Sequence, residues 1–480
     1  MNRTRWIGPS RLVLTALAAG GLVALAALSP VSAVRVSDRT PQDTTLEPVA
    51  TAALSCPGSE LSGIKGVDDI QVPARIAVAT APDSVLGPVK THGTGEVQVR
   101  SGDTVTKTVT QRGLAASDDK VGVGPSDVLA TGALAPGLAA TQEWSVARPE
   151  INGLATVPCA SPGSDLWLLG GGGAPGRQER LILSNPGANE VTVDLQVLGR
   201  KGLVPSPTGA TVVPAHGRVV MLVDAISGAE ESPALHVRAS GGTVRAVMSD
   251  IWLDGSVPVG AETTVPTAAP SKTQVIPAYF TGTSGSLRIA VPGDQQAVVS
   301  AQILGPDGAS PLGGVLRVAA RSTGELPVTG LPSGRYAVRV TADVPIVTSI
   351  FSAWRTGAQK GDFAWSPSTE PAQGLLGAAF PVGHGRSLLL SSTGAPAKAT
   401  VTWQVDGTWT STSVDVPQDS SSRLDLGDAT AVWVRRAGGT GDLRAAVGTV
   451  GGGDGAQIAS MAPLVETAVQ SAVGRAYPIS

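Results

Sequence analysis

The residues with the clearest chemistry are two cysteines, Cys56 and Cys159, in a chain of 480 residues. A zinc ion needs about four ligands, and no matching pair of histidines accompanies these cysteines, so a zinc site is a poor interpretation. In an exported chain two cysteines most simply form one disulfide. We therefore predict a Cys56–Cys159 disulfide that joins the beginning of residues 56–164 to their end, with two unpaired buried thiols as the alternative.

A glycine-rich stretch, GGGGAPGR at 170–177, has glycines with the separation found in phosphate-binding loops. Such a loop needs free backbone N–H groups at a helix N-terminus, followed by a lysine and a hydroxyl side chain. Here Pro175 removes one N–H, Arg177 stands in the place of the lysine, and a β-pattern follows. We predict a flexible hairpin loop.

No other local pattern indicates a reactive site. The four histidines, at positions 92, 216, 236 and 384, lie in separate segments without metal-ligand spacing. We expect His216, His236 and His384 at the surface. Residues 282–286, GTSGS, precede a strand, so they do not form a nucleophile elbow. Adjacent acids in an extended chain point in opposite directions, so the pairs are interpreted as solvated turn residues: Asp68-Asp69, Asp118-Asp119 and Glu230-Glu231. The sequence predicts no catalytic residue, no cofactor-binding residue, no metal site, no cofactor and no enzyme activity.

Two tryptophans offer the remaining chemistry, because an exposed indole can stack on a sugar ring. Trp403 falls on the apolar register of its strand, where core packing explains it. Trp409 lies in a turn-like stretch, so we expect it to be more exposed than Trp403. Large aromatic side chains are mostly buried, so packing is the first interpretation of Trp409 and a sugar platform the second.

The elements that would position these residues are strands in a repeated pattern. In LILSNPGANEVTVDLQVLG, at 181–199, apolar and polar residues alternate on both sides of a turn, which predicts a two-stranded piece of a half-buried antiparallel sheet. Similar patterns begin at Leu287 and Leu388. The turn glycines Gly187, Gly293 and Gly394 lie 106 and 101 residues apart, far longer than the roughly 20–50 residues of a solenoid or propeller repeat. A unit of that size with many short strands is typical of a β-sandwich.

Composition agrees with this fold class. Apolar residues make up 42% and charged residues 15% of the chain, and 60 glycines with 36 prolines fit many short strands and turns. We predict an all-β protein of tandem immunoglobulin- or fibronectin-like β-sandwich repeats behind an N-terminal signal or anchor. The expected segments are a signal peptide or membrane anchor (1–33), a linker (34–55), an N-terminal β-rich unit closed by the disulfide (56–164), and sandwich repeats 1 (165–270), 2 (271–374) and 3 (375–480).

Within the N-terminal unit the strands are harder to predict. Alternating patterns favour strands at 76–79, 96–100 and 104–110. Residues 111–139 are rich in Gly, Ala, Asp and Ser and predict a long loop with at most a short helical turn. The C-terminal stretch 460–473 fits either a helix or a closing strand.

The first 33 residues predict an extracytoplasmic location. Arg3, Arg5 and Arg11 precede an uncharged run at 12–29, and Ala33 ends a stretch that resembles a cleavage site. A cleaved signal and a retained anchor both export the rest of the chain, and membrane contact is expected only through this segment. The formal net charge of −3 argues against nucleic acid as a partner.

Several motifs together resemble a family of exported actinobacterial proteins of unknown function. They are RGLA at 112–115, PCASPGSDLWLLGGG at 158–172, LILSNPG at 181–187 and MAPL at 461–464. Such proteins are often encoded near a large membrane glycosyltransferase, which implies a role in the cell envelope, and the family supplies no catalytic residues.

The first functional hypothesis is therefore a non-enzymatic exported envelope protein that binds or scaffolds envelope proteins or glycans, for example as an accessory to envelope glycan assembly. One alternative is an array of carbohydrate-binding modules. The other is a hydrolase with a non-local site in residues 56–165, which would need a pocket lined by two facing carboxylates or by a serine and a histidine.

Overall fold

The computed structural model describes residues 45–61, 72–119, 121–205, 209–228, 230–453 and 456–473. The predicted signal or anchor at 1–33 and most of the predicted linker lie outside these residues. The chain divides into two compact units, Met1–Leu46 with Ala472–Ser480, and Glu47–Ser471. The sandwiches described below belong to the second unit. None of the helices in the described ranges is long and apolar enough to cross a membrane.

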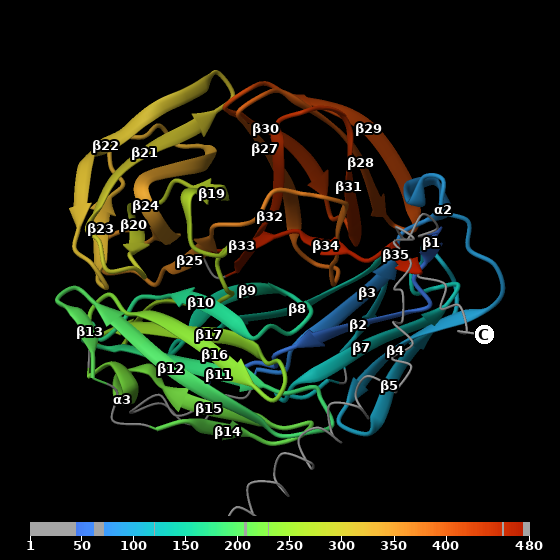
Figure 1. Ribbon diagram of the computed structural model, residues 1–480, viewed down its shortest axis with the longest axis horizontal. Coiled ribbons are helices and arrows are strands. Elements are labelled where there is room, and N and C mark those ends of the chain that lie inside the picture. Colours follow the sequence, from blue (N-terminus) through green and yellow to red (C-terminus); the bar gives the residue numbers. More distant parts are fainter. Residues whose placement is uncertain are drawn as a thin grey trace, which may run out of the picture. The chain divides into compact units, whose positions relative to one another are not determined.

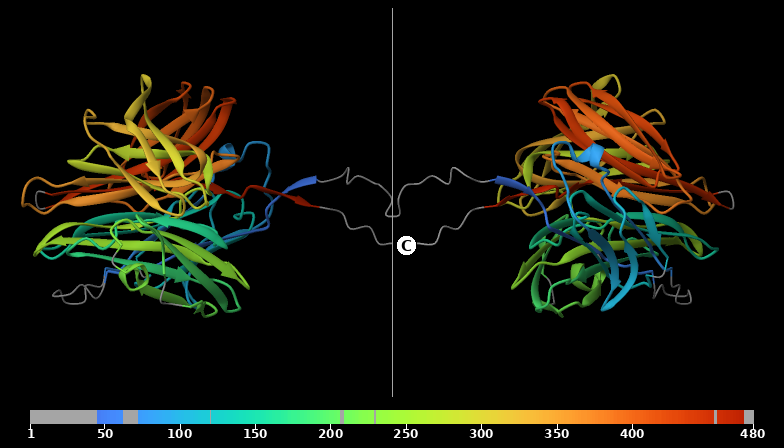
Figure 2. Two further views of the ribbon diagram at one scale, coloured as in Figure 1. Left: turned by 60° about the vertical axis from the view of Figure 1, so that its left-hand side comes forward. Right: turned by 90° about the vertical axis from the view of Figure 1, so that its right-hand side faces the viewer.

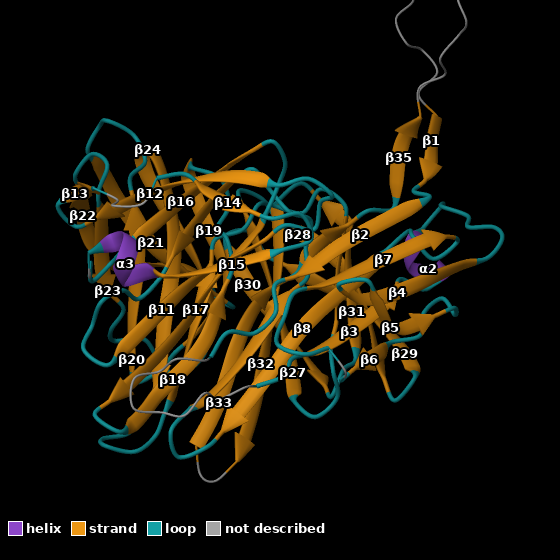
Figure 3. Ribbon diagram, turned by 90° about the horizontal axis from the view of Figure 1, so that it is seen from below, coloured by secondary structure: helices purple, strands orange, loops and turns teal. Residues whose placement is uncertain are grey.

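The predicted all-β sandwich fold is confirmed. Strands account for almost all regular structure in the described ranges (Figure 3), and the helices there are α2 (Asp83–Leu86) and α3 (Val223–Ser227). Two short strands lie near the ends of the described chain, β1 (Thr45–Pro48) and β35 (Gln470–Val473). The C-terminal stretch that fitted a helix or a strand is therefore strand.

Residues 51–158 form an N-terminal sandwich of two four-stranded sheets, β2-β7-β4-β5 and β6-β3-β8-β9. Its strands are β2 (Thr51–Cys56), β3 (Arg75–Thr80), β4 (Gly95–Ser101), β5 (Thr104–Val109), β6 (Ala116–Asp118), β7 (Ser126–Gly132), β8 (Leu138–Ala147) and β9 (Asn152–Pro158). Two expectations are wrong here. The predicted linker at 34–55 ends in strand β2, which pairs with β7, and the predicted loop at 111–139 contains β6 and β7 and the start of β8.

The three predicted repeats each form a sandwich with the same strand order. Repeat 1 contains β10 (Asp165–Leu169), β11 (Arg177–Ser184), β12 (Val191–Gly199), β13 (Gly202–Val204), β14 (Thr211–Val213), β15 (Arg218–Leu222), β16 (Ala234–Ser240), β17 (Arg245–Asp254) and β18 (Val257–Thr264). Repeat 2 contains β19 (Ser271–Phe280), β20 (Ser284–Ala290), β21 (Ala297–Gly305), β22 (Gly308–Val318), β23 (Thr323–Pro327), β24 (Arg335–Trp354) and β25 (Asp362–Pro367). Repeat 3 contains β26 (Leu375–Ala379), β27 (Gly385–Thr393), β28 (Ala397–Val405), β29 (Thr408–Val416), β30 (Ser420–Gly427), β31 (Ala431–Gly439), β32 (Asp442–Gly453), β33 (Ala456–Pro463) and β34 (Val465–Thr467).

One topology is common to all four sandwiches, so the N-terminal unit is a fourth copy of the repeat. We call the sheets β6-β3-β8-β9, β15-β11-β17-β18, β23-β20-β24-β25 and β30-β27-β32-β33 the inner sheets, and their partners the outer sheets. The sequence concealed this copy because helix α2 and its loops separate β3 from β4, where the repeats have a short turn such as 185–190.

The hairpin predicted at 181–199 is wrong. Strand β11 pairs with β15 and β17 in the inner sheet, whereas β12 pairs with β13, β14 and β16 in the outer sheet. The turn at Asn185–Gly187 therefore carries the chain across the sandwich. The alternating pattern could not distinguish these possibilities, because both strands present their apolar face to the same core.

Strand β24 shows how the chain passes between sheets without a turn. Its first half pairs with β19 and β21 in the outer sheet, and its second half pairs with β20 and β25 in the inner sheet. At the same point the other sandwiches break the strand near a glycine with positive φ: Gly132 (56°), Gly241 (80°) and Gly439 (77°). Repeat 2 has Thr341–Pro345 there, without a glycine, and the strand continues.

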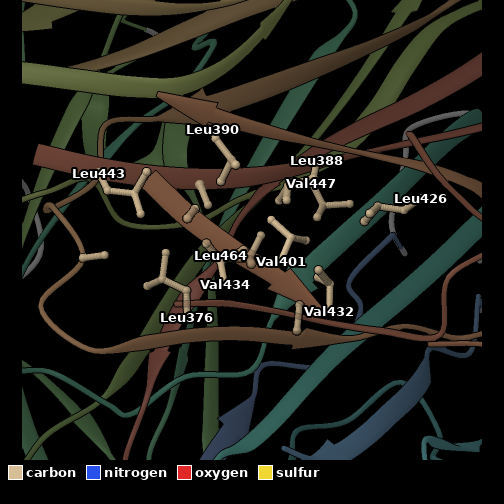
Figure 4. Packing of buried hydrophobic residues seen from close by; sticks show 14 of the residues in the cluster. Leu376, Leu388, Leu390, Val401, Leu426, Val432, Val434, Leu443, Val447 and Leu464 are labelled. Atoms are coloured by element: carbon tan, nitrogen blue, oxygen red, sulfur yellow. The ribbon is translucent and has the colours of Figure 1, made fainter. Parts of the chain in front are cut away.

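Each sandwich has its own hydrophobic core between its sheets. In repeat 3 the labelled Leu388 and Leu390 of the inner sheet face Val401 and Val434 of the outer sheet (Figure 4). Full burial of one such side chain contributes about 2 kcal/mol. Each sandwich thus contains the apolar layer that its alternating strands predict.

Within Glu47–Ser471 the four sandwiches contact one another through the last strands of their inner sheets. Strand β9 contacts β18, β18 contacts β25, β25 contacts β33, and β33 contacts β9. Figure 1 labels β9, β25 and β33 near the middle of the view. Figure 2 shows the strands of repeats 2 and 3, in yellow to red, above those of the N-terminal sandwich and repeat 1, in blue to green. Further apolar clusters fill the contacts between neighbouring sandwiches. The sandwiches are therefore packed lobes of one compact unit.

Candidate functional site

A cavity of about 640 Å³ lies between repeats 2 and 3. Repeat 2 contributes strands β19 and β24 with the loop before β24, and repeat 3 contributes strands β27, β30 and β33. The lining is Phe280, Thr281, Pro306, Ser333, Gly334, Arg335, Tyr336, Trp354, Leu389, Ser421, Ser422, Arg423 and Gln457. We call this cavity the aromatic cleft.

Three aromatic side chains from repeat 2 line the aromatic cleft. Phe280 ends β19 and is buried, whereas Tyr336 and Trp354 lie near the two ends of β24 and are half-buried. The Trp354 indole N–H donates to the Thr281 carbonyl at 3.0 Å, and the Tyr336 hydroxyl donates to the Pro332 carbonyl at 3.1 Å. These hydrogen bonds orient the rings while part of each ring stays accessible.

Two arginines supply positive charge to the same cleft. The Arg335 guanidinium lies 4.5 Å from the centre of the Phe280 ring, a cation–π contact. Its Nη1 atom is buried and, among the described atoms, has no hydrogen-bond partner. Burial and the nearby charge of Arg423 lower the pKa of Arg335, although Asp425 opposes them. Arg423 itself is half exposed, with Asp425 at 3.8 Å.

The aromatic cleft presents groups suited to ligand recognition. None of its described lining residues is Asp, Glu, His or Cys. Aromatic faces, guanidinium groups, hydroxyls and the Gln457 amide are the groups that bind a polar ring bearing a negative charge.

A second cavity, of about 430 Å³, lies between the N-terminal sandwich and repeat 1. Its lining includes Asp103 in the β4–β5 turn, Asp127 in β7 and His216 in the β14–β15 turn. Burial raises the pKa of Asp127, opposed by a hydrogen bond from Ser55 and by the charges of His216 and Arg100. This cavity thus places two carboxylates of the N-terminal sandwich in one lining.

Two buried carboxylates lie where the four last strands meet. Asp362 of β25 accepts backbone N–H groups from Ala459 at 2.9 Å, Ala261 at 3.4 Å, Phe363 at 2.9 Å and Leu154. One donor thus comes from each sandwich. Burial raises the pKa of Asp362 well above its usual value. This carboxyl group joins the four sandwiches.

Glu262 of β18 lies close to Asp362 and is fully buried. It accepts the N–H of Thr263 at 2.8 Å and the hydroxyl of Ser460 at 3.4 Å, while its Oε2 has no partner among the described atoms. Burial and the charge of Asp362 raise its pKa well above the usual value. Burial therefore raises the pKa of both acids, and their hydrogen bonds connect strands of neighbouring sandwiches.

The predicted disulfide is confirmed. Cys56, at the end of β2, and Cys159, directly after β9, are bonded with a Cα–Cα distance of 4.5 Å. The bond connects an edge strand of the outer sheet to the end of the inner sheet. In the chain-entropy model a loop of this length contributes about 4.7 kcal/mol to stability.

The glycine-rich stretch at 170–177 does not resemble a phosphate loop, but it is not a hairpin loop either. It connects β10 of the outer sheet to β11 of the inner sheet. Its N–H groups at Gly171 and Gly172 donate to the Glu179 carboxylate at 2.6 and 2.7 Å. An internal carboxylate thus uses the donors that a phosphate would need, and Arg177 turns to Asp250.

The histidines differ from the surface prediction in two cases. His216 is exposed as expected. His236 stacks on Trp167 at 4.1 Å and contacts Asp165 at 2.8 Å, which leaves its side chain 14% exposed. His384 has its Nδ1 2.9 Å from Glu143 and is only 10% exposed. The sequence could not predict the latter contact, because Glu143 belongs to another sandwich.

The other candidates prove to be packing or turn residues. Trp403 packs against the core of repeat 3, as predicted. Trp409 is half-buried and lies 5.4 Å from Trp433, among apolar residues between repeat 3 and the N-terminal sandwich. It is therefore a poor sugar platform. Asp118 is buried, contrary to the prediction of a solvated turn residue, and Asp68-Asp69 lie outside the described residues.

The residues of the aromatic cleft escaped the sequence analysis because no local signal marks them. Arg335 and Tyr336 begin an ordinary alternating strand, and their partner Arg423 is far away in the chain. In the described ranges no three His, Cys, Asp or Glu side chains come together as metal ligands.

Fold and cleft together define a class, that of all-β proteins of packed sandwich repeats with clefts between the repeats. Residues 114–427 match the model of a family of unknown function, DUF5719. The match covers more than half of the 480 residues, so the chain belongs to this family. It extends from the end of the N-terminal sandwich's β5–β6 loop to β30 and thus includes most strands of the four sandwiches. No curated protein shows a significant match to the chain.

Proposed function

We propose that this chain is a non-enzymatic binding protein of the cell envelope, and that the aromatic cleft binds an anionic carbohydrate. The observation that carries the proposal is the Arg335 guanidinium, which stacks on Phe280 with Nη1 unpartnered among the described atoms. A buried N–H without a partner is costly, and a carboxylate or phosphate group on a ligand would satisfy it.

Carbohydrate is the favoured ligand because the cleft combines the partly accessible rings of Tyr336 and Trp354 with polar groups. Sugar rings stack on aromatic faces, and their hydroxyls exchange hydrogen bonds with serine and amide side chains. Ser422 and Gln457 supply such groups from repeat 3.

An extracytoplasmic location is supported by the Cys56–Cys159 disulfide, because disulfides persist mainly in oxidising compartments. The arginines and the uncharged run of the first 33 residues support export, and the resemblance to exported actinobacterial proteins supports the envelope. Fusing residues 1–60 to a phosphatase that is active only outside the cytoplasm tests this part, and an inactive fusion would contradict it.

The binding test compares the purified chain with the variant Arg335→Gln, using tetragalacturonate as the anionic probe and maltotetraose as the neutral one. We expect tetragalacturonate to bind and the variant to lose at least tenfold in affinity. Arg317→Gln is the matched control, because it removes the same charge from an exposed position of repeat 2. Equal losses in the two variants, or tighter binding of maltotetraose, would contradict the proposal.

A second candidate function is hydrolysis in the cavity that contains Asp103 and Asp127, favoured by the burial that raises the pKa of Asp127. A carboxyl group with a raised pKa can act as a general acid. If this function holds, Asp127→Asn abolishes hydrolysis of an envelope polysaccharide by the purified chain. Absence of hydrolysis by the unaltered chain eliminates it.

A further inference from the structure

A third cavity, of about 290 Å³, lies where the connections that follow the four last strands converge. It is lined by Pro158, Ala160, Leu166, Arg245, Val265, Pro266, Thr267, Ala268, Ser368, Thr369, Glu370, Pro371, Ala372, Leu376, Pro463, Leu464, Val465 and Glu466. All four sandwiches contribute to it, and most of the lining is apolar. We call it the junction pocket.

The junction pocket contains the buried guanidinium of Arg245. Arg245, the first residue of β17, is 5% exposed. Among the described residues its one hydrogen-bond partner is the Pro158 carbonyl, 3.0 Å from Nη2, while Nε has none. No described carboxylate lies within ion-pair distance of it. Burial lowers the pKa of Arg245 to about 10, and no nearby charge opposes this effect.

Arg444 of repeat 3 occupies the equivalent position and shows what Arg245 lacks. In the register of the inner sheets Arg245 lies opposite Ser184, and Arg444 lies opposite Ser391. Yet Arg444 donates to the Thr369 carbonyl at 2.9 Å and to the Thr393 hydroxyl at 3.2 Å, and the charges of Asp442 and Glu370 favour its cation.

The cause of this difference can be read from the sequence. Asp442 precedes Arg444 by two residues, and Thr243 takes its place in repeat 1. Repeat 1 thus retains the cation without its acid. Buried charges in proteins are normally paired, so an isolated one beside a cavity indicates that the partner comes from outside the chain.

Other polar atoms of the pocket are also unpartnered. The hydroxyl oxygens of Ser368 and Thr369, in the connection after β25, are buried without hydrogen-bond partners among the described atoms. Two carboxylates, Glu370 and Glu466, are exposed lining residues, and solvent screens their charge. The apolar residues around them have no polar groups in their side chains.

We propose that the junction pocket binds a small amphipathic anion, whose carboxylate or phosphate pairs with Arg245 and whose apolar body contacts Leu166, Val265 and Leu376. The site is separate from the aromatic cleft, and none of the described residues lines both. A failure of carbohydrate binding therefore leaves this proposal intact, and the reverse also holds.

The test titrates the purified full chain calorimetrically with octanoate and octyl phosphate, and with octanol and inorganic phosphate as controls. We expect one of the amphipathic anions to bind at least tenfold more tightly than octanol. Preference for octanoate identifies a carboxylate ligand, and preference for octyl phosphate a phosphate ligand. Equal binding of octanol, or no binding of either anion, overturns the proposal.

Substitutions in and near the junction pocket test whether the anion binds there. Arg245→Gln is expected to weaken binding of the anion at least tenfold, whereas the matched control Arg444→Gln changes it less than twofold. Ala268→Trp keeps the Arg245 cation and fills the pocket. It therefore tests whether the anion binds in the junction pocket even if Arg245→Gln does not fold. Unchanged affinity in a folded Arg245→Gln variant or in Ala268→Trp overturns the proposal.

Discussion

Two buried clusters of acids and arginines lie between neighbouring sandwiches, and they solve the same physical problem differently. The His384 cluster, between the N-terminal sandwich and repeat 3, consists of Arg75, Glu143, His384 and Arg386. The Arg177 cluster, between repeats 1 and 2, consists of Arg177, Glu179, Asp250 and Trp365. The first surrounds one acid with several donors, whereas the second places one arginine beside two acids.

In the His384 cluster, Glu143 is fully buried and lies 3.0 Å from Arg386, 2.9 Å from His384 and 3.2 Å from Arg75. Burial alone would raise its pKa, but the hydrogen bond from His384 and the charge of Arg386 overcome this effect, and the pKa lies below its usual value. The acid is therefore ionised at neutral pH.

In the Arg177 cluster, the guanidinium pairs with Asp250, which also accepts the Trp365 indole N–H at 2.9 Å. The rings of Trp252, Phe351, Phe363 and Trp365 surround the cation at 5.1–5.8 Å. The second acid, Glu179, is left without a cation of its own. Burial and the charge of Asp250 raise its pKa to about 7. A surplus of donors therefore lowers the pKa of the buried acid, and a surplus of acids raises it, so the two contacts respond to pH in opposite directions.

The largest expected effect is that of Arg177→Met. Because Asp250 would keep only the Trp365 N–H and would face Glu179 without an intervening cation, we expect a loss of about 4 kcal/mol in the free energy of unfolding. Urea denaturation measures this. If the loss is no larger than that of Arg386→Met, the packing of the aromatic rings and the burial of Asp250 do not require the Arg177 cation.

Arg386→Met is expected to cost less, about 3 kcal/mol. Glu143 would retain His384 and Arg75, which donate to the same carboxylate. The same denaturation experiment measures it, with the exposed Arg317→Met as the control for lost charge. If Arg386→Met proves the more damaging change, the surplus of donors at Glu143 offers no protection.

The pH profile sharpens the comparison through Glu179→Gln. Glu179 has a raised pKa, so its contribution to stability is present below about pH 4.5 and is lost as the pH rises through about 7. The variant should therefore gain about 1–2 kcal/mol relative to the parent between pH 5 and pH 8. Glu143 has a lowered pKa, so its contribution is present above about pH 4.5 and is lost on acidification. Thermal denaturation between about pH 3 and pH 8 tests both directions, because the contribution of Glu143 changes below pH 4.5 and that of Glu179 changes above it. A stability difference between variant and parent that does not change with pH would refute the assignment to Glu179.

The smallest expected effect is that of His384→Asn, about 1 kcal/mol, because one of several hydrogen bonds to Glu143 is lost. The change should also raise the pH at which acid unfolding begins, since His384 is one of the groups that lower the pKa of Glu143. Acid titration followed by circular dichroism measures this. His236→Asn, which affects a contact within repeat 1, is the control and should leave the acid transition where it is.

The sequence by itself determined the local features of this protein. Alternation of apolar and polar residues predicted strands such as β12 and β28, and the spacing of Gly187, Gly293 and Gly394 predicted three sandwich repeats. The prediction of one disulfide required only two cysteines and an oxidising location. These features depend on neighbours along the chain, so a linear pattern contains them.

Only the tertiary structure decided which strands pair, how many repeats there are, and where ligands could bind. Strands β11 and β12 look like a hairpin in the sequence, but they lie in facing sheets that share one core. The aromatic cleft brings Arg335 beside Arg423, and the junction pocket brings together the ends of four strands. Whether a buried charge such as Arg245 is paired depends on residues from other sandwiches. The sequence could show that Thr243 stands where repeat 3 has Asp442, but only the packed structure shows that no other acid of the described residues lies within ion-pair distance of Arg245.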